Sequence, residues 1–205
     1  MKRFIKKYFG ATKWKRLADL VFSLVGMLVL SPVFLVICCA LFFTPNSKVF
    51  FSHERRGRKG KPFKIYKFQT MYNNAPNCAT AELENPEQYI TKIGRILRKT
   101  SLDELPQLWN IFKGDMSFVG PRPLISSEMR AHRLRLEYGV YRFRPGLTGW
   151  AQVNGRDSIS LMKKMKLDKE YCDNWSIGLD LKIIFMSVKT VITREGFHEG
   201  KFHRR

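Results

Sequence analysis

Hydrophobic and polar positions divide the chain into one long apolar stretch near the N-terminus and a patterned region after it. Residues 20–43 (LVFSLVGMLVLSPVFLVICCALFF) carry no charge, and as a straight helix they would extend about 36 Å, enough to cross the hydrocarbon of a bilayer. Ser31 and Pro32 lie in the middle, where proline removes a backbone hydrogen bond and bends or breaks a helix. The pattern predicts a membrane segment with a break. Asp19, just before it, is interpreted as an acid that interacts with the positive end of this helix.

The apolar stretch has a basic flank on each side. Residues 1–16 hold seven Lys or Arg and no acid, and residues 45–67 hold eight against Glu54 alone. Because an excess of Lys and Arg marks the cytoplasmic flank of a membrane segment, both ends are expected on the same side. This favours a re-entrant segment over a kinked spanning helix, although spanning helices tolerate proline too.

After the apolar stretch the pattern changes to short elements. Residues 48–71 (KVFFSHERRGRKGKPFKIYKFQTM) alternate as two strands around a basic, glycine-containing turn, which predicts a β-hairpin. Residues 73–88 are polar and lack periodicity, so a surface loop is expected. Residues 90–99 predict an amphipathic helix with a wholly basic polar face. Its apolar face consists of Ile90, Ile93, Ile96 and Leu97.

Two further helices are expected. One follows Ser101, its cap, and stops at Gly114. Its inward side chains are predicted to be Leu105, Leu108, Trp109 and Phe112. The other covers residues 181–194, which are apolar with basic residues spaced around them. That pattern fits a core helix or one lying in the bilayer interface.

These elements predict an α+β fold that is mostly helical. A basic N-terminal segment (1–19) precedes a re-entrant membrane hairpin of helix, break and helix (20–43). A compact cytoplasmic domain (44–205) follows, containing the small β-hairpin and interfacial amphipathic helices. Two hundred and five residues suffice for one such body and one appended element.

Charge and cysteine usage narrow the class of protein. The chain has 37 Lys and Arg against 17 Asp and Glu, a formal net charge of +20, which favours polyanionic partners such as nucleic acid, anionic lipid or phosphorylated substrates. Its four cysteines have neither metal-ligand spacing nor the pattern of a disulfide framework. No Walker or Rossmann glycine motif is present.

Adjacent acids, Asp103 and Glu104, are the first candidates for chemistry. They follow a helix whose basic side chains include Arg95, Arg98 and Lys99. A structural interpretation competes, because Ser101 and Glu104 have the spacing of a capping box, with Asp103 complementing the helix dipole. On the local sequence alone both interpretations stay open.

Two glycine- and proline-containing motifs follow. In GDMSFVGPRPL the flanking prolines stiffen the backbone around Arg122, which would hold its guanidinium out at low entropic cost; an ordinary surface turn is the alternative. RFRPGLTGWAQVNGRDS carries the donors Gln152, Asn154 and Arg156, and we expect Gln152 to contact phosphate. An enzyme that attacks a diphosphate needs cations or a metal and an aligned nucleophile. Carboxylates, rigid arginines and Mg²⁺ would meet that need.

In order and spacing, these motifs resemble those of the small monotopic polyprenol-phosphate glycosyl-1-phosphate transferases, also called the bacterial sugar transferase family. The likeness covers nearly the whole chain, from KRLADL and Ser31-Pro32 through FKIYKFQTM, SLDELPQLWNIFKGDMSFVGPRP and RPGLTGWAQVNGR to DKEYCDNWSIGLDLKIIF. Gln69 stands where the family commonly has a basic residue, which puts a phosphate role there in doubt. The chain is expected to be the minimal form, without the extra N-terminal membrane helices of longer relatives.

This resemblance implies transfer of a sugar 1-phosphate from a UDP-sugar to polyprenyl (undecaprenyl) phosphate by a ping-pong route. Asp103 would attack the β-phosphorus, release UMP and carry the phosphosugar. Glu104 and Mg²⁺ would steady the diphosphate, with Asp103 and Glu104 as the metal ligands. The phosphate-binding arginines would be Arg98, Arg122 and Arg156.

The same resemblance implies a place in the cell and a set of partners. It places a monotopic protein in the bacterial inner membrane, among membrane lipids and with its catalytic domain facing the cytoplasm. Downstream glycosyltransferases are candidate partners, and nucleic acid is not expected. The alternative function, a membrane-tethered nucleic-acid or anionic-lipid binder, explains the basic residues but leaves the LDEL, GPRP and NGR motifs without a role. A membrane-curving protein would explain only residues 1–43.

Overall fold

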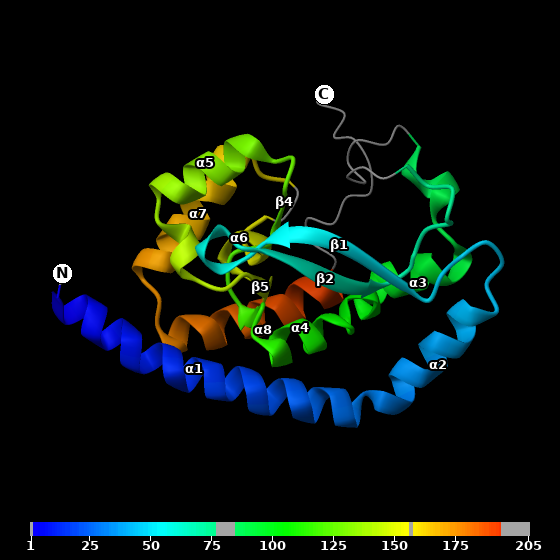
Figure 1. Cartoon of the computed structure of the whole chain (residues 1–205), viewed down its shortest axis with the longest axis horizontal. Helices are drawn as coiled ribbons and strands as arrows, with labels where there is room; N and C mark the ends of the chain where they lie inside the picture. The colour runs from blue at the N-terminus through cyan, green and yellow to red at the C-terminus, as the bar shows by residue number, and fades with distance from the viewer. Residues whose placement is uncertain (1, 77–84, 156–157, 194–205) are drawn as a thin grey trace.

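The computed structural model describes residues 2–76, 85–155 and 158–193. They form a mostly helical α+β fold with two small sheets (Figure 1). Two helices, α1 (Lys2–Val29) and α2 (Ser31–Phe42), make a bent arm along the lower side of the molecule in Figure 1. The body, which we define as the described residues from 48 to 193, lies on this arm. The expected fold class is confirmed at this level.

A break between α1 and α2 falls where the sequence predicts it. Pro32 has no N–H to donate to Leu28 O, and the Ser31 hydroxyl donates to that carbonyl instead, at 2.8 Å. No single described helix is long and apolar enough to cross a membrane. Lys13–Val29 and Ser31–Phe42, bent by 60° relative to each other, meet that criterion as a pair. The predicted division at residue 19 has no counterpart in the helices, because α1 continues through it.

The predicted hairpin is confirmed. β1 (Phe50–Arg56) and β2 (Pro62–Phe68) pair antiparallel, from Phe50 opposite Phe68 to Arg56 opposite Pro62, around a 3-10 turn at Arg58–Gly60. β4 (Leu124–Ile125) adds to β1, so the strand order is β2-β1-β4. β3 (Ser117–Val119) and β5 (Gly146–Thr148) pair parallel in a second sheet. β3, β4 and β5 are too short to show a periodicity in the sequence.

Helices make up most of the body. They are α3 (Lys92–Thr100), α4 (Gln107–Lys113), α5 (Met129–Glu137), α6 (Trp150–Val153), α7 (Leu161–Asp173) and α8 (Ile177–Thr193), with 3-10 turns η3 (Pro86–Tyr89), η4 (Leu102–Glu104) and η5 (Val140–Arg142). Gly114 ends α4 as predicted, with a positive φ of 94°. The predicted inward position of Trp109 is wrong, because this residue is 48% exposed, and Ile96 on the apolar face of α3 is 62% exposed. Arg194 and part of the expected loop, residues 77–84, lie outside the described residues.

One side of the arm packs on the body. Ile37 and Leu41 of α2 are buried against Phe68 and Leu97. Met27 of α1 and Leu30, at the break between the helices, pack against a buried cluster that contains Leu108 and Ile111 of α4. The arm is therefore part of the folded core, and not only a tether.

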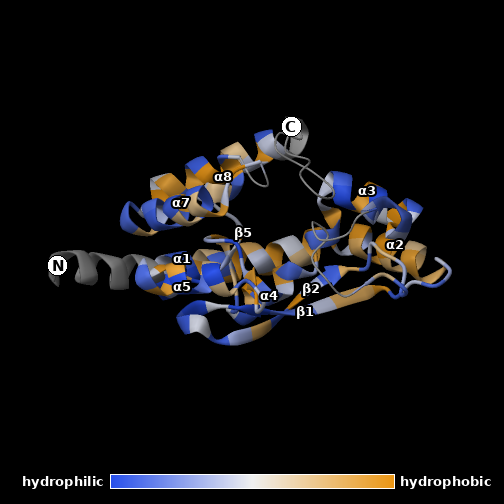
Figure 2. Cartoon of the chain, turned by 90° about the horizontal axis from the view of Figure 1, so that it is seen from above, coloured by the Kyte–Doolittle hydropathy of each residue, from blue (hydrophilic) through white to orange (hydrophobic). Residues whose placement is uncertain are grey.

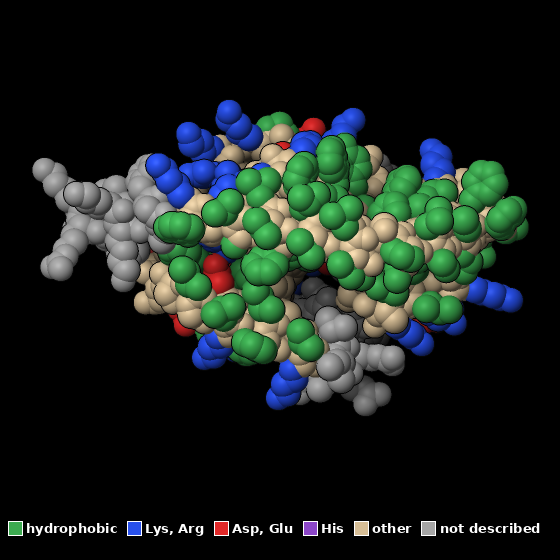
Figure 3. All heavy atoms as spheres, turned by 90° about the horizontal axis from the view of Figure 1, so that it is seen from below, with side chains coloured by type: hydrophobic (Ala, Val, Ile, Leu, Met, Phe, Trp, Pro, Cys, Tyr) green, Lys and Arg blue, Asp and Glu red, His purple; other side chains and the backbone are tan. Residues whose placement is uncertain are grey.

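Away from the body, the other side of the arm is apolar and exposed. Apolar side chains gather over α1 and α2 in the view from below (Figure 3), and the hydropathy colouring shows apolar residues along α8 as well (Figure 2). The most exposed are Trp14, Phe22, Leu28, Val29, Leu35, Val36, Phe42 and Phe43 on the arm and Phe185 on α8. Apolar patches of this kind mark surfaces that contact a partner or a membrane.

Candidate active site

Asp103 and Glu104 lie in a tight connection between α3 and α4. Ser101 adopts the left-handed conformation (φ 58°, ψ 16°) and ends α3. Leu102–Glu104 then form one 3-10 turn, and α4 begins only at Gln107. The two carboxylate side chains are mostly covered, with 13% and 23% of their surface exposed. The connection therefore presents both acids at a partly enclosed place.

The capping-box interpretation of these acids is wrong. Ser101 makes no side-chain capping bond. Its backbone N–H donates to Arg98 O at 3.2 Å, whereas a capping box would need it to donate to the Glu104 carboxylate. Helix capping therefore does not explain why two acids stand at this turn.

Lys67 of β2 reaches both carboxylates. Its Nζ lies 2.6 Å from Glu104 Oε1 and 3.5 Å from Asp103 Oδ2. Burial raises the pKa of Asp103, and the negative charge of Glu104 acts in the same direction, while Lys67 and Arg98 oppose the rise. Asp103 is thus a desolvated carboxylate next to two cations, the environment in which perturbed functional groups are found.

Arg98 joins this group from the last turn of α3. Its Nε donates to Thr70 Oγ1 at 2.8 Å, and its charge acts on Asp103. Thr70 follows β2, the strand that carries Lys67. Residues from two distant parts of the chain therefore surround the acid pair, and the structure brings together Arg98, Asp103 and Glu104 as expected.

Arg122 is exposed in the turn between β3 and β4. Among the described residues, Lys67, Glu104 and Arg98 act on the pKa of Asp103, whereas Arg122 lies in a separate turn. Its positive charge acts on Arg55 of β1, where it adds to burial in lowering the pKa of Arg55 to about 10. Two neighbouring guanidinium groups make this turn a second concentration of positive charge, at the opposite end of β1 from the Lys67 pairing.

The remaining predicted site residues follow β5. Gln152 lies on α6, and its Nε2 donates to Leu147 O at 3.1 Å. Its Oε1 is buried without a hydrogen-bond partner among the described residues, and a side chain at Gly149 would meet that oxygen at 2.9 Å. Arg156 lies outside the described residues. Phosphate binding by Gln152 and Arg156 stays a prediction.

The donor set for a metal consists of Asp103 and Glu104. Among the described residues no group of three or more His, Cys, Asp or Glu is placed to hold an ion, and the described cysteines, residues 38, 39 and 172, are unpaired. Mg²⁺ is usually bound by one or two carboxylates together with substrate phosphates and water. Two carboxylates that are already paired with Lys67 are too few to hold Mg²⁺ alone, so the pair fits this ion only with substrate phosphate as a further ligand.

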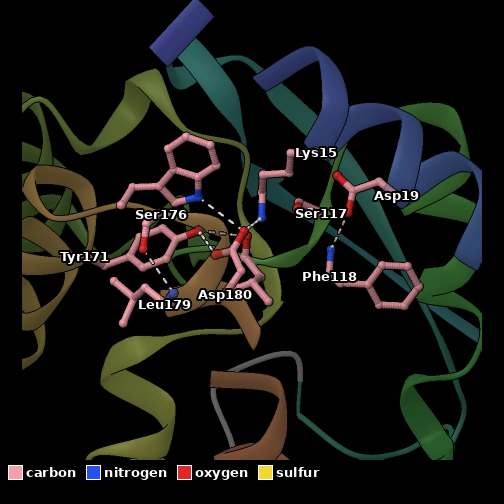
Figure 4. Close-up of polar contacts among 10 residues, drawn as sticks. Lys15, Asp19, Ser117, Phe118, Tyr171, Ser176, Leu179 and Asp180 are labelled. Atoms are coloured by element: carbon pink, nitrogen blue, oxygen red, sulfur yellow. Dashed lines mark hydrogen bonds and ion pairs between the residues drawn. The ribbon is translucent and has the colours of Figure 1, made fainter. Parts of the chain in front are cut away.

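Polar residues near the start of the bent arm fix it to the body (Figure 4). Lys15 pairs with Asp180 at 2.5 Å, and Asp180 also accepts from Tyr171 at 2.8 Å. Asp19 is buried and accepts from Ser117 Oγ and Phe118 N, both at 3.1 Å. The interpretation of Asp19 as an acid at a helix start is wrong, because α1 begins at Lys2 and Asp19 binds β3 instead.

Comparison with known protein families matches most of the chain. The family model described as bacterial sugar transferase matches residues 10–194. The chain belongs to this family. A similar protein is the "Uncharacterized sugar transferase EpsL" of Bacillus subtilis (strain 168), 42% identical over 185 residues that cover 90% of each chain. Membership in the bacterial sugar transferase family confirms the resemblance seen in the motifs.

Other relatives carry more specific names. The exopolysaccharide production protein ExoY of Rhizobium meliloti (strain 1021) is 37% identical over 198 residues, covering 89% of this chain and 87% of the relative. The UDP-glucose:undecaprenyl-phosphate glucose-1-phosphate transferase of Escherichia coli (strain K12) is 38% identical over 181 residues, covering 85% of this chain and 39% of the relative. The sugar transferase region is thus a part of a longer protein in the second case.

Sequence reasoning missed Lys67 and Asp19 as members of these clusters. Lys67 appears in the sequence as one of eight cations in residues 45–67, and only its position on β2 sets it apart. Asp19 stands alone as an acid before an apolar segment, which is a signal that its charge needs a specific partner. That partner, β3, lies 98 residues away along the chain.

Proposed function

We propose that this chain transfers a sugar 1-phosphate from a UDP-sugar to undecaprenyl phosphate, giving undecaprenyl-diphosphate-sugar and UMP. This reaction would start the membrane-bound assembly of a glycan. The observation that carries the proposal is the acid pair Asp103–Glu104. The pair is not part of a capping box, and the positive charges of Lys67 and Arg98 act on it. Family membership and the names of the relatives support the substrates.

Asp103 is the proposed nucleophile. One carboxylate oxygen attacks the β-phosphorus in line with the bridging oxygen, whose bond to that phosphorus breaks and whose electron pair leaves with UMP. The sugar phosphate is then held as a phosphoaspartate. In the second step a phosphate oxygen of undecaprenyl phosphate attacks the same phosphorus, and the bond to Asp103 breaks. The carboxylate is regenerated, so no other reactant is needed.

The cations around Asp103 would act on the developing charge. Lys67 and Arg98 are fixed by their bonds to Glu104 and Thr70, and such preorganised charges stabilise a transition state without reorganisation. Arg122, Arg156 and Gln152 would bind phosphate farther from the attacked phosphorus. A bound Mg²⁺, held by Asp103 and Glu104, would neutralise diphosphate charge.

The bent arm supports a monotopic place in the membrane. We propose that residues 20–43 form the re-entrant membrane hairpin after the basic segment 1–19, and that residues 44–205 form the catalytic domain on the cytoplasmic face. The exposed apolar side chains of the arm and the basic flanks on both of its ends support this topology. Leu181, Phe185 and Val188 of α8 are exposed, so α8 would lie in the bilayer interface.

The test of this function is release of UMP from a panel of UDP-sugars in the presence of undecaprenyl phosphate. Asp103→Asn should lower turnover by roughly 10⁴-fold or more and abolish a phosphosugar adduct detectable by mass spectrometry. The matched control is Asp173→Asn, at an exposed ion pair, which should react normally. Chelation of Mg²⁺ should stop the wild type. Turnover retained in Asp103→Asn would refute the nucleophile, and binding of duplex DNA without UMP release would favour the alternative function.

A further inference from the structure

The turn that carries Arg122 is fixed by backbone bonds before it reaches the arginine. Gly120 N donates to Thr148 O at 2.9 Å, and Gly146 N donates to Pro121 O at 3.0 Å. A side chain on Gly120 would meet Arg144 O at 2.4 Å, so the second sheet approaches the turn closely there. These contacts hold Gly120 and Pro121 in place.

Arg122 has a support of its own from α5. Arg135 donates from Nη1 to Arg122 O at 2.7 Å. The other side of the same guanidinium donates to Asp168 Oδ2 on α7, from Nη2 at 2.6 Å and from Nε at 3.2 Å. Only 3% of either side chain is exposed. The guanidinium of Arg135 therefore links Arg122 to a buried carboxylate.

Stability alone gives a weak reason for this buried pair. Removing two charges from water costs several kcal/mol per ion, and replacing such a pair by apolar side chains is often neutral or stabilising. The surroundings would accept apolar side chains, since Ala131 and Met165, one turn before each partner, belong to a buried cluster with Leu124. An apolar pair would fill the same space. It would not donate a hydrogen bond to Arg122 O.

We propose that the Arg135–Asp168 pair is a positioning device for Arg122, an inference that rests on the proposed function in which Arg122 binds phosphate. Asp168 fixes the orientation of the Arg135 guanidinium, and Arg135 fixes the carbonyl of Arg122. The prolines on both sides of Arg122 restrict its backbone further, which fixes the point from which its side chain extends. Helices α5 and α7 thereby act on phosphate binding without touching the substrate.

The test replaces the pair by apolar side chains of similar size. Arg135→Met/Asp168→Leu should fold, with a melting temperature near that of the wild type, but raise KM for the UDP-sugar on the order of 10- to 100-fold. Arg122→Gln should raise KM to a similar extent. Arg135→Lys keeps the buried charges paired but cannot reach both partners, and should raise KM in the same direction. The matched control is Lys169→Met/Asp173→Leu, at an exposed pair on α7, with unchanged KM.

The deciding measurement combines the replacements. Because the pair acts through Arg122, adding Arg135→Met/Asp168→Leu to Arg122→Gln should raise KM no further. An additional loss in that combination would overturn the inference. The inference would also be overturned if Arg135→Met/Asp168→Leu folds and both it and Arg135→Lys have the KM of the wild type. A wild-type KM in Arg122→Gln would overturn it as well. Failure of the proposed function would give other results: the wild type would release no UMP, or Asp103→Asn would retain turnover. The inference would then fail together with the proposed function.

Discussion

Burial and neighbouring charges act together on the carboxyl group of the proposed nucleophile, Asp103. Burial raises the pKa of Asp103, and its neighbour Glu104 raises it further, so the carboxyl group tends toward the protonated form. A protonated carboxyl group is a poor nucleophile. Lys67 opposes both effects from 3.5 Å while it pairs with Glu104 at 2.6 Å. Lys67 therefore favours the ionised form of Asp103.

Lys67→Met should therefore shift the acid limb of the pH–rate profile to higher pH. Without the ammonium the pKa of Asp103 rises, and a larger fraction of enzyme is inactive at a given low pH. The measurement is kcat/KM for the UDP-sugar against pH. Lys64→Met, on the same strand with an exposed side chain, should leave the profile in place. An unshifted acid limb in Lys67→Met would contradict this role.

Titration of Asp103 also affects the stability of the folded protein. Since the pKa of Asp103 is raised in the fold, its contribution to stability is present at low pH and is lost as pH rises through the raised value. Loss of activity on acidification of Lys67→Met is thus not expected to come from unfolding at this residue. A melting temperature taken alongside each rate separates the two effects.

Helix α1 serves two environments with different faces. Lys15, Arg16 and Asp19 bind the body, where Arg16 donates to Ile111 O at 2.5 Å and to Phe112 O at 2.6 Å. These are carbonyls in the last turn of α4, the helix that follows the acid pair. Side chains such as Phe22 and Leu28 are exposed and apolar. Helix α1, which would enter the membrane, is therefore hydrogen-bonded to α4, the helix next to the acid pair.

Asp19 provides a test of this docking. Asp19→Leu leaves Phe118 N and Ser117 Oγ without their acceptor, which should lower the free energy of unfolding by about 1–3 kcal/mol. Asp19→Asn keeps an acceptor oxygen and should cost less. Denaturant unfolding in detergent micelles measures both, with Asp173→Leu at an exposed site as control. Equal stability of Asp19→Leu and the wild type would mean that these bonds do not hold α1 to β3.

The whole molecule has an apolar side and a charged side. The arm presents exposed apolar side chains on one face (Figure 3), while the acid pair and its cations lie on the opposite side of the arm, in the body. A re-entrant arm would place the site near the level where a lipid phosphate meets a soluble nucleotide sugar. The net charge of +20 would add attraction to anionic lipid.

The membrane topology can be measured with single cysteines introduced at the two ends of the apolar stretch. Lys13→Cys and Lys48→Cys, each in a chain whose four native cysteines are replaced by serine, flank it. A membrane-impermeant maleimide should label both in inverted inner-membrane vesicles and neither in spheroplasts, because both flanks are basic. The native-cysteine-free chain is the control. Labelling from opposite sides would show a spanning helix.

The sequence predicted the elements whose cause is local. The break follows from Pro32 itself, and Ser31 relieves the carbonyl that proline leaves without a donor. The β1–β2 hairpin follows from alternation around a glycine turn, and the end of α4 from Gly114. Short strands and helices such as β3, β4 and α6 were not predicted, since two to four residues carry no period.

The apolar segment, its break, the hairpin and the motifs that carry the candidate chemistry can be read from the sequence, because each depends on residues close together in the chain. The packing of distant segments placed Lys67 beside Asp103 and Glu104, and it ruled out the capping box, because Ser101 makes no capping bond. It also paired Asp19 with β3 and Arg135 with Arg122. Such contacts join segments whose meeting depends on the packing of the whole chain, so no local pattern records them.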